Sequence, residues 1–406
     1  MVIKNAVICD LNRYEKLDIE IRDKKIFKID NNIDSKEYID AEGLILMPSI
    51  VDLNVKTFNK NLTLKTLSKL SKEAISSGVS DILLMPNLNL PVDKESVIEF
   101  VKSKSKSINL IKIHTSINAL KESGKLSNIA IMIQKGAKAI FTNSDIDTNL
   151  LKRVFEYSKM SETTLICNSH NREVALDGVV NDSEIGFKLG LDTIAKVCET
   201  IEVAKVCELA KYLNIDILLQ NLSTSRSIEL TKNFDNITTE VSIHHLIAND
   251  NKCNDFNTFA KIMPPLREES ERGKLIEALK KDEIDILTSL HSPISKDNKD
   301  LAFSEASFGI DSIKNYFPLC YTHLVKKDII SLQKLSKLIS YNPSKALNLN
   351  SGEIKEGMKA NFMLVDLNSK RKIDDKNSIY KNQELYGEIK STIINGKIKY
   401  ELLNQE

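Results

Sequence analysis

Both ends of the chain show short apolar runs separated by turn residues, which is the pattern of a strand meander. In residues 1–48 the apolar runs alternate with Asp, Asn and Gly positions, as in short strands joined by tight turns. Residues 361–400 have the same character, and the Asn395-Gly396 step is a strong signal for a tight hairpin. Neither end could close a core alone. We therefore predict one small β-sandwich domain built from residues 1–48 plus 347–406.

Between these ends the pattern changes to longer apolar runs, each followed by a stretch with helical spacing. This alternation predicts repeated βα units around a parallel sheet. The strand candidates are residues 49–55, 80–85, 109–114, 138–142, 163–167, 215–220, 237–241 and 284–289. Together they predict an α/β fold, a (β/α)₈ TIM barrel over residues 49–346, in which the chemistry belongs at the C-terminal ends of the strands.

Composition narrows the class of protein without identifying it. Of the 406 residues, 42% are hydrophobic and 28% are charged, as in soluble globular proteins. The net charge of +1 gives no electrostatic reason to expect nucleic acid or a membrane surface as a partner. No apolar stretch reaches the ~20 residues of a membrane span, and the N-terminus lacks the layout of a signal peptide. The six cysteines form no C-x-x-C pair, which suits free thiols in the cytoplasm.

Five segments of the central and C-terminal regions carry motifs that occur together, in this order, in one family. They are Asp81-Ile-Leu-Leu-Met-Pro-Asn-Leu-Asn89, Met263-Pro-Pro-Leu-Arg267, His291-Ser-Pro293, Asn342-Pro-Ser-Lys-Ala346 and residues 352–366. By these motifs the chain resembles the dihydroorotases, amidohydrolases that close carbamoyl-aspartate to dihydroorotate in pyrimidine synthesis. The resemblance covers nearly the whole chain. It implies a barrel of the metal-dependent amidohydrolase type with a small β-sandwich.

The resemblance also implies where zinc ligands should lie. The family places two histidines after strand 1, an acidic or carbamylated ligand at strand 4, single histidines at strands 5 and 6, and an aspartate at strand 8 that is both ligand and general base. This chain has, in the same order, Asn54 and Lys56, Asn143 or Ser144, Asn168, Asn221 and Leu290.

These replacements remove the expected chemistry. An amide is a poor zinc ligand and an ammonium has no lone pair to give. Hydrolysis or cyclisation of an amide on this scaffold needs a metal-bound hydroxide and a carboxylate that carries its proton. The sequence therefore predicts no zinc cofactor and no catalytic residue. A metal-free pocket should not keep buried carboxylates, and the positions implied to be acidic hold neutral residues here. Lys56 adds one positive charge near the place of the metal. We expect its ammonium to fill part of that place, held by amide oxygens of Asn168 and Asn221.

The substrate side of the site is altered as well. The family places an arginine two residues past the second histidine and a histidine after the strand 8 Ala-Pro, where this chain has Phe58 and Ile294. The usual carboxylate clamp is thereby lost. Asn87 and Arg267 remain at positions matching the family's pocket, and with His291 they form the predicted residual pocket.

A rearranged metal site is the alternative interpretation. His114, His170, His244 and His291 all come near predicted strand ends, and four such ligands could hold zinc if they converged with tetrahedral geometry. The chain would then be an active dihydroorotase or cyclic amidohydrolase. The other interpretation is that these are core or loop histidines with ordinary hydrogen-bond partners.

Three functional hypotheses follow. The dihydroorotase family includes catalytically silent homologues that assemble with aspartate transcarbamoylase, so the first is a non-catalytic structural or regulatory subunit of such an oligomer. The second is an active cyclic amidohydrolase with an unusual site. The third is a metal-free sensor that binds a small molecule in the vestigial pocket.

Overall fold

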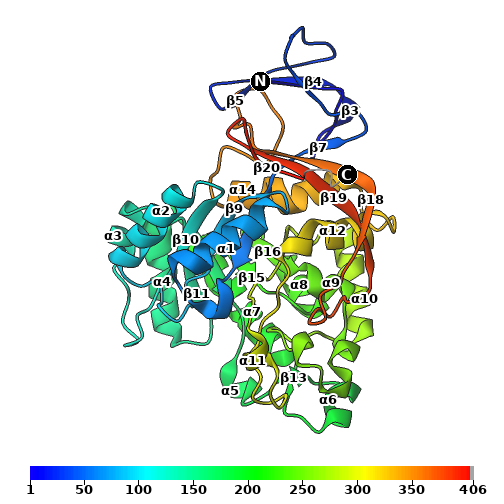
Figure 1. Cartoon of the computed structure of the whole chain (residues 1–406). Coiled ribbons are helices and arrows are strands. Elements are labelled where there is room, and N and C mark those ends of the chain that lie inside the picture. Colours follow the sequence, from blue (N-terminus) through cyan, green and yellow to red (C-terminus); the bar gives the residue numbers. More distant parts are fainter. Residues whose placement is uncertain (403–406) are drawn as a thin grey trace.

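The computed structural model describes residues 1–402, and its centre is a nearly closed barrel of parallel strands (Figure 1). The eight strands follow one another around the barrel in chain order. They are β8 (Ile50–Val55), β9 (Val79–Leu84), β10 (Lys112–Asn118), β11 (Ala139–Asn143), β12 (Thr164–Asn168), β15 (Ile217–Gln220), β16 (Ile237–Ser242) and β17 (Ile286–Thr288). A bridge between Val55 and His291 joins the first strand to the end of the last. The predicted barrel is confirmed.

One strand begins later than predicted. Residues 109–114 were expected to form the third strand, but β10 begins at Lys112 and continues to Asn118. The reason lies in the preceding helix α2 (Glu95–Ile108), which ends on Asn109 in the left-handed conformation, with φ +52°. Such a C-cap uses the residues that the pattern assigned to the strand. His114 therefore lies inside β10 and not at its exit.

Helices follow most of the strands and lie around the outside of the barrel (Figure 1). The longer ones are α1 (Leu64–Ile75), α2, α4 (Thr148–Met160), α7 (Val197–Leu213), α8 (Ser225–Thr231) and α10 (Glu269–Lys280). Shorter helices are α3 (Ile129–Gln134), α5 (Arg172–Ala175), α6 (Glu184–Leu189), α9 (Ile243–Ile247), α11 (Lys296–Lys299), α12 (Tyr316–Cys320), α13 (Leu332–Ser336) and α14 (Asn342–Ala346). No helix within residues 1–402 is both long enough and apolar enough to cross a membrane.

Short 3₁₀- and π-helical segments and a two-stranded ribbon complete the barrel region. The segments are η1 (Phe58–Lys60), η2 (Asp250–Phe256), η3 (Thr258–Ala260), η4 (Ile313–Asn315), η5 (Tyr321–Val325) and η6 (Lys337–Tyr341). The ribbon pairs β13 (Val180–Asn181) with β14 (Thr193–Ile194). It lies in the long connection between β12 and β15, close to the ends of the strands where function is expected.

Two sheets built from both ends of the chain lie at the amino end of the barrel (Figure 1). The six-stranded sheet has the order β20-β19-β18-β7-β2-β3, and the four-stranded sheet has the order β5-β4-β1-β6. The N-terminal strands are β1 (Val2–Lys4), β2 (Val7–Cys9), β3 (Tyr14–Lys16), β4 (Asp18–Arg22), β5 (Lys25–Asp30), β6 (Ile39–Asp40) and β7 (Ile45–Pro48). The C-terminal strands are β18 (Phe362–Lys372), β19 (Glu384–Ile394) and β20 (Lys397–Glu401).

The pairing of β7 with β18 connects the two ends of the chain. Pro48 lies opposite Phe362 and Ile45 opposite Val365 in an antiparallel register. Apolar residues from both ends share one buried cluster, including Ile3, Leu46 and Phe362. Because β7 runs almost directly into β8, the barrel strands point away from these terminal sheets, and their carboxyl ends lie at the opposite end of the molecule.

Candidate functional site at the carboxyl ends of the strands

The seven residues predicted at the former metal-ligand positions are called the vestigial positions below. Four of them form one row of hydrogen-bonded amides. Asn54 Nδ2 donates to Asn221 Oδ1 at 2.7 Å, Asn221 Nδ2 donates to Asn168 Oδ1 at 3.2 Å, and Asn168 Nδ2 donates to Asn143 Oδ1 at 3.2 Å. These residues come from β8, the end of β15, β12 and β11. Four positions that are far apart in sequence thus meet at the functional end of the barrel. We call this set the amide row.

A buried carboxyl group that sequence reasoning missed lies at the inner end of the amide row. Glu240, on β16, accepts hydrogen bonds from Thr288 Oγ1 at 2.5 Å and from Asn54 Nδ2 at 3.4 Å. Burial raises the pKa of this carboxyl to about 7. The sequence did contain a signal for this group, because Glu240 is a charged residue within 237–241, a segment otherwise expected to be a buried strand.

The second oxygen of Glu240 has an unusual neighbour. Glu240 Oε2 and Gln220 Oε1 are both buried, and neither has a hydrogen-bond donor among the described residues. The Gln220 side chain lies beside the carboxyl, and its Nε2 is already used in a bond to Leu53 O at 3.2 Å. A protonated carboxyl has an O–H to donate, and the unpaired Gln220 Oε1 is an acceptor on the neighbouring side chain. Because burial raises its pKa to about 7, Glu240 is partly protonated near neutral pH.

Asp52 provides a second buried carboxyl group beneath the strand ends. It accepts hydrogen bonds from the Ser289 side chain and from the backbone N–H of Asn54 at 3.2 Å. Burial raises its pKa to about 6, although these hydrogen bonds act in the opposite direction. Asp52 thus ties β8 to the end of β17 and positions Asn54 at one end of the amide row.

The Lys56 ammonium is not held by the amide oxygens of Asn168 and Asn221, as had been predicted. Its backbone N–H donates to His291 O at 2.7 Å and helps to close the barrel. Its side chain is half-buried, and within residues 1–402 its ammonium forms no hydrogen bond or ion pair. The amide oxygens of Asn168 and Asn221 instead accept hydrogen bonds from the next amide in the row. Burial lowers the pKa of Lys56 to about 8, and the charge of Lys60 acts in the same direction.

The two remaining vestigial positions are apolar or turned away from the row. Leu290 is buried in the apolar cluster of the barrel wall and has a positive φ of +52°. Leu290 therefore offers no acceptor at the position where the resemblance implies a general base. Ser144 is fully buried and its hydroxyl lies near Glu202 on α7, so Asn143 and not Ser144 is the strand 4 residue in the row.

The structure does not assemble the predicted residual pocket. Arg267 is only 3% exposed. Its guanidinium donates to Ser223 Oγ at 3.0 Å and to Asn181 Oδ1 at 2.9 Å, so it holds the β13 connection in place and is not open to a ligand. Asn87 is exposed. His291 Nδ1 accepts backbone N–H bonds from η4 and the residue before it, at 3.3 Å each, and its buried Nε2 has no partner in the described chain.

The histidines of the rearranged-site interpretation are dispersed. His114 pairs with Asp81 at 2.8 Å inside the barrel wall. His244 uses both ring nitrogens, with Tyr380 Oη at 2.7 Å and Ser289 O at 3.0 Å, and burial lowers its pKa to about 4. His170 is half-buried, and burial lowers its pKa. The four histidines therefore do not converge on one metal position.

In the described part of the chain, one group of possible metal ligands does lie close together. It consists of Glu73, His291 and Asp311. Lys314 Nζ lies 3.1 Å from Glu73, so a cation of the protein already neutralises this carboxylate. His291 Nδ1 faces backbone donors, as described above.

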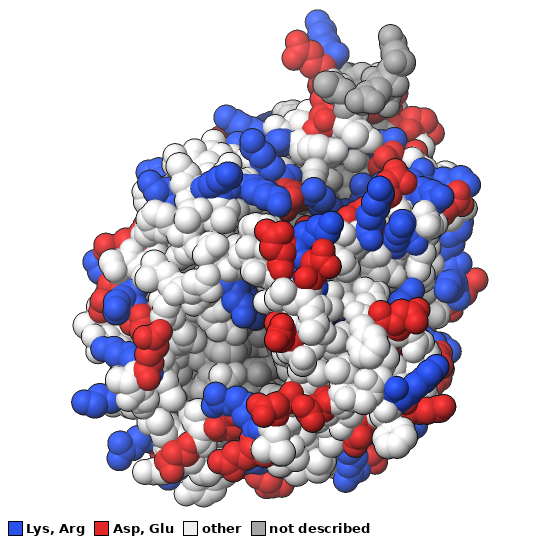
Figure 2. Space-filling model, turned by 60° about the horizontal axis from the view of Figure 1, so that its bottom comes forward, with Lys and Arg blue, Asp and Glu red and all other residues white. Residues whose placement is uncertain are grey.

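The side chains at the positions where the resemblance implies metal ligands are not of the types that hold zinc. Structural and catalytic zinc sites use thiolate, imidazole and carboxylate ligands. Here those positions hold amides bonded to one another, an ammonium and a leucine. The face away from the terminal sheets is nevertheless hollowed, with basic and acidic side chains around the rim (Figure 2). The chain thus presents a hollowed face at the end of the molecule where the carboxyl ends of the strands lie.

The fold and the position of the site define an amidohydrolase-type barrel, and comparison with known proteins agrees. A profile described as the Amidohydrolase family matches residues 266–399. The fold is similar to that of L-hydantoinase (dihydropyrimidinase) from Arthrobacter aurescens, with a TM-score of 0.87, 17% identity and coverage of 99% of this chain and 97% of that one.

Full-length relatives define the family more closely. A dihydroorotase from Caldanaerobacter subterraneus is 30% identical over 424 residues, covering 99% of this chain and 97% of the relative. A probable dihydroorotase-like protein from Helicobacter pylori is 30% identical over 407 residues, covering 98% of each. The chain belongs to the dihydroorotase family of amidohydrolases.

Proposed function

We propose that this chain is a non-catalytic dihydroorotase-like protein of pyrimidine biosynthesis, acting as a structural or regulatory subunit that partners aspartate transcarbamoylase in an oligomer. The observation that supports this most directly is the amide row. Neutral side chains bonded to one another stand where an active relative needs ligands for a metal ion, and Leu290 stands where it needs a general base.

The remaining acidic groups are poorly placed to substitute for that base. Glu240 lies below the amide row and is fully buried, and its carboxyl is held by Thr288 and Asn54. Asp52 is fully buried as well and is bonded to Ser289. A general base must reach the proton that it removes, directly or through one water. Neither carboxyl opens onto the mouth of the barrel.

The partner is inferred from the resemblance and from the complete fold. All the barrel strands and both terminal sheets are formed, so the chain offers an intact surface for assembly although its site is altered. Silent homologues in this family assemble with aspartate transcarbamoylase. A scaffold without metal chemistry fits a role of this kind.

Catalytic silence is tested by metal analysis and by turnover assays on the purified protein. We expect less than one zinc per chain and no conversion of carbamoyl-aspartate or dihydroorotate. A catalytically active member of the family, assayed in parallel, is the positive control. Stoichiometric zinc accompanied by turnover would overturn the proposal in favour of an active hydrolase.

The partner is tested by co-expression with the aspartate transcarbamoylase of the same cell. We expect the two proteins to co-purify and to elute together at a mass above that of either alone. The control is aspartate transcarbamoylase prepared from cells that lack this chain. If aspartate transcarbamoylase prepared without this chain has the same activity and the same mass as the co-expressed preparation, the subunit role fails.

A second candidate function, binding of a small anion, is favoured by Lys56. Its ammonium is half-buried and unpaired within residues 1–402, close to where barrel closure brings His291 and Lys56 together. Such a cation is a suitable partner for a carboxylate ligand. Titration with dihydroorotate, comparing the wild type with Lys56→Met, tests this directly. Binding that is lost in the variant supports a sensor, and no binding to the wild type excludes this ligand.

A further inference from the structure

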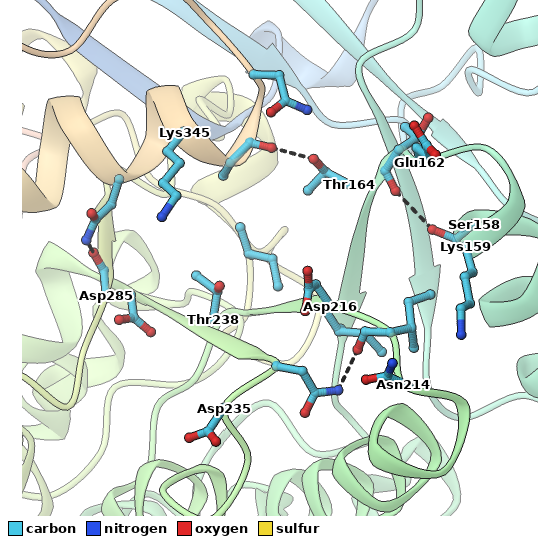
Figure 3. A pocket seen from close by; sticks show the side chains of 18 of the residues that line it. Ser158, Lys159, Glu162, Thr164, Asn214, Asp216, Asp235, Thr238, Asp285 and Lys345 are labelled. Atoms are coloured by element: carbon cyan, nitrogen blue, oxygen red, sulfur yellow. Dashed lines mark hydrogen bonds between the residues drawn. The ribbon is translucent and has the colours of Figure 1, made fainter.

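Charged side chains without a charged partner occur in two different surroundings, at opposite ends of the barrel. At the amino end, Figure 3 shows Lys345 and Asp216 in a cavity of about 840 Å³, and both side chains are exposed to solvent there. At the carboxyl end, Lys261 and Lys299 are each only 2% exposed, and neither forms an ion pair within residues 1–402. A buried ammonium without a counter-ion is costly, whereas an exposed one costs little. The energetically important pair is therefore Lys261 and Lys299.

These two lysines join two segments of the chain by hydrogen bonds to backbone carbonyls. Lys261 Nζ, next to η3, donates to Phe303 O at 2.7 Å and to Ser304 O at 2.9 Å. Lys299 Nζ, on α11, donates to Thr258 O and to Lys261 O, both at 3.0 Å. Each side chain thus crosses from its own segment to the other. Each meets two acceptors, which is the number that a neutral amine with two N–H groups can still satisfy.

The second of these segments belongs to a longer connection that we call the strap, residues 295–309. The strap follows β17 and lies at the carboxyl end of the barrel. Near its start the Ser295 N–H donates to Asn59 Oδ1, in η1, at 2.7 Å. At its end the Gly309 N–H donates to Lys261 O at 3.1 Å. The strap is therefore attached to η1, which follows the first barrel strand, and to the chain beside η3, which follows the seventh.

The surroundings of the two lysines disfavour their charged forms. Burial lowers the pKa of Lys299 to about 7 and the pKa of Lys261 to about 8. The charge of Lys261 also lowers the pKa of Lys299, and Cys253 acts in the opposite direction. The rings of Phe303 and Phe308 lie 5.7 and 4.6 Å from Lys261 Nζ and partly offset its burial. Within residues 1–402 neither lysine pairs with a carboxylate of the two connections, which are Asp250, Asp255, Asp297, Asp300 and Glu305.

We propose that the strap is a proton-sensitive closure at the carboxyl end of the barrel, held shut while Lys261 and Lys299 are neutral and released when they take up protons. Opening transfers both side chains to water, where their ordinary pKa is 10.5. Between about pH 7 and pH 10.5 the open form therefore binds more protons than the closed form, and a fall in pH favours opening. The strap acts within a single chain, so this closure goes beyond the proposed function and does not depend on a partner.

Hydrogen–deuterium exchange of the full chain, read by mass spectrometry between pH 6 and pH 9, tests the closure. After correction for the intrinsic exchange rate, the opening constant of residues 299–309 should fall about a hundredfold or more from pH 7 to pH 9. Peptides from β15 are the internal reference and should be more protected at every pH, because the strap opens without unfolding of the barrel. An opening constant that does not change with pH, or strap exchange no faster than that of β15, would overturn the proposal.

Substitution of the lysines separates their charge from the packing of the strap. Lys299→Met should reduce the change between pH 7 and pH 9 to about tenfold, and the double variant that also carries Lys261→Met should abolish it. Lys296→Met, at an exposed position of α11, is the matched control and should follow the wild type. If the double variant keeps the full pH dependence, other groups cause it and the proposal is wrong. Thermal unfolding shows whether each variant is folded, and the wild-type profile decides the question if one is not.

Discussion

Replacing Glu240 by glutamine is expected to stabilise the protein at alkaline pH and to leave it nearly unchanged in acid. Glu240 has an ordinary pKa of 4.5, which burial raises to about 7 in the folded chain. Below pH 4.5 the carboxyl is protonated in both the folded and the unfolded state. Above about pH 7 it is ionised in both, and the folded state then holds a buried charge. The free energy of unfolding should therefore fall as pH rises from 4.5 to 7.

The size of this fall follows from the two pKa values. At 1.36 kcal/mol per pKa unit, the difference between 4.5 and about 7 corresponds to about 3 kcal/mol. In Glu240→Gln the side-chain oxygen can still accept from Thr288 and Asn54, and the new amide N–H can donate to the unpaired Gln220 Oε1. The variant should therefore equal the wild type near pH 4.5 and exceed it by up to about 3 kcal/mol at pH 8.

Urea unfolding at a series of pH values measures this difference. Glu122→Gln, at an exposed position, is the matched control and should follow the wild type at every pH. Asp52 also has a raised pKa, but it is present in all three proteins, so the difference between variant and wild type isolates Glu240. A variant that is destabilised equally at pH 4.5 and pH 8 would refute the idea that Glu240 is protonated in the folded state.

Three further measurements test other features. Excess EDTA should leave the midpoint of thermal unfolding unchanged, because the amide row offers no zinc ligand; a lowered midpoint on chelation would contradict a metal-free site. Asn168→Ala should lower the free energy of unfolding by about 0.5–1.5 kcal/mol, measured with urea, because it removes the hydrogen bonds of Asn168 to Asn221 and Asn143; no change would mean that the row does not stabilise the fold. Burial lowers the pKa of Lys299 from 10.5 to about 7. Between pH 7 and pH 10.5 the unfolded state therefore binds more protons than the folded state, and the free energy of unfolding should rise with pH. Lys299→Met should flatten this rise, and a parallel rise in the variant would assign it to another group.

The architecture could be predicted from the sequence because it depends on periodicity. Each barrel strand is an apolar run followed by a helical stretch, and all eight were found from this pattern alone. The start of β10 could not be found in this way, because the left-handed cap at Asn109 depends on how α2 ends. His114 was consequently expected at a strand exit and lies within the strand instead.

The site was predictable as a set of positions but not as a network. The resemblance places Asn54, Asn143, Asn168 and Asn221 at separate strand ends, and no feature of one sequence shows that they bond to one another. That outcome depends on the stagger between neighbouring strands. Arg267 illustrates the reverse case, since its position suggested a ligand contact but its side chain is buried in bonds to Ser223 and Asn181.

The three links of the amide row all run in the same direction, from Asn54 through Asn221 and Asn168 to Asn143. Turning one amide over would set two oxygens or two N–H groups against each other, so a reversal must involve every member at once. The row is therefore a cooperative unit with only two satisfactory orientations. Glu240 selects one of them, because its oxygen requires the N–H side of Asn54. Because the row has this polarity, the buried carboxyl of Glu240 determines whether Asn143 presents its amide N–H₂ or its amide oxygen at the outer end of the row.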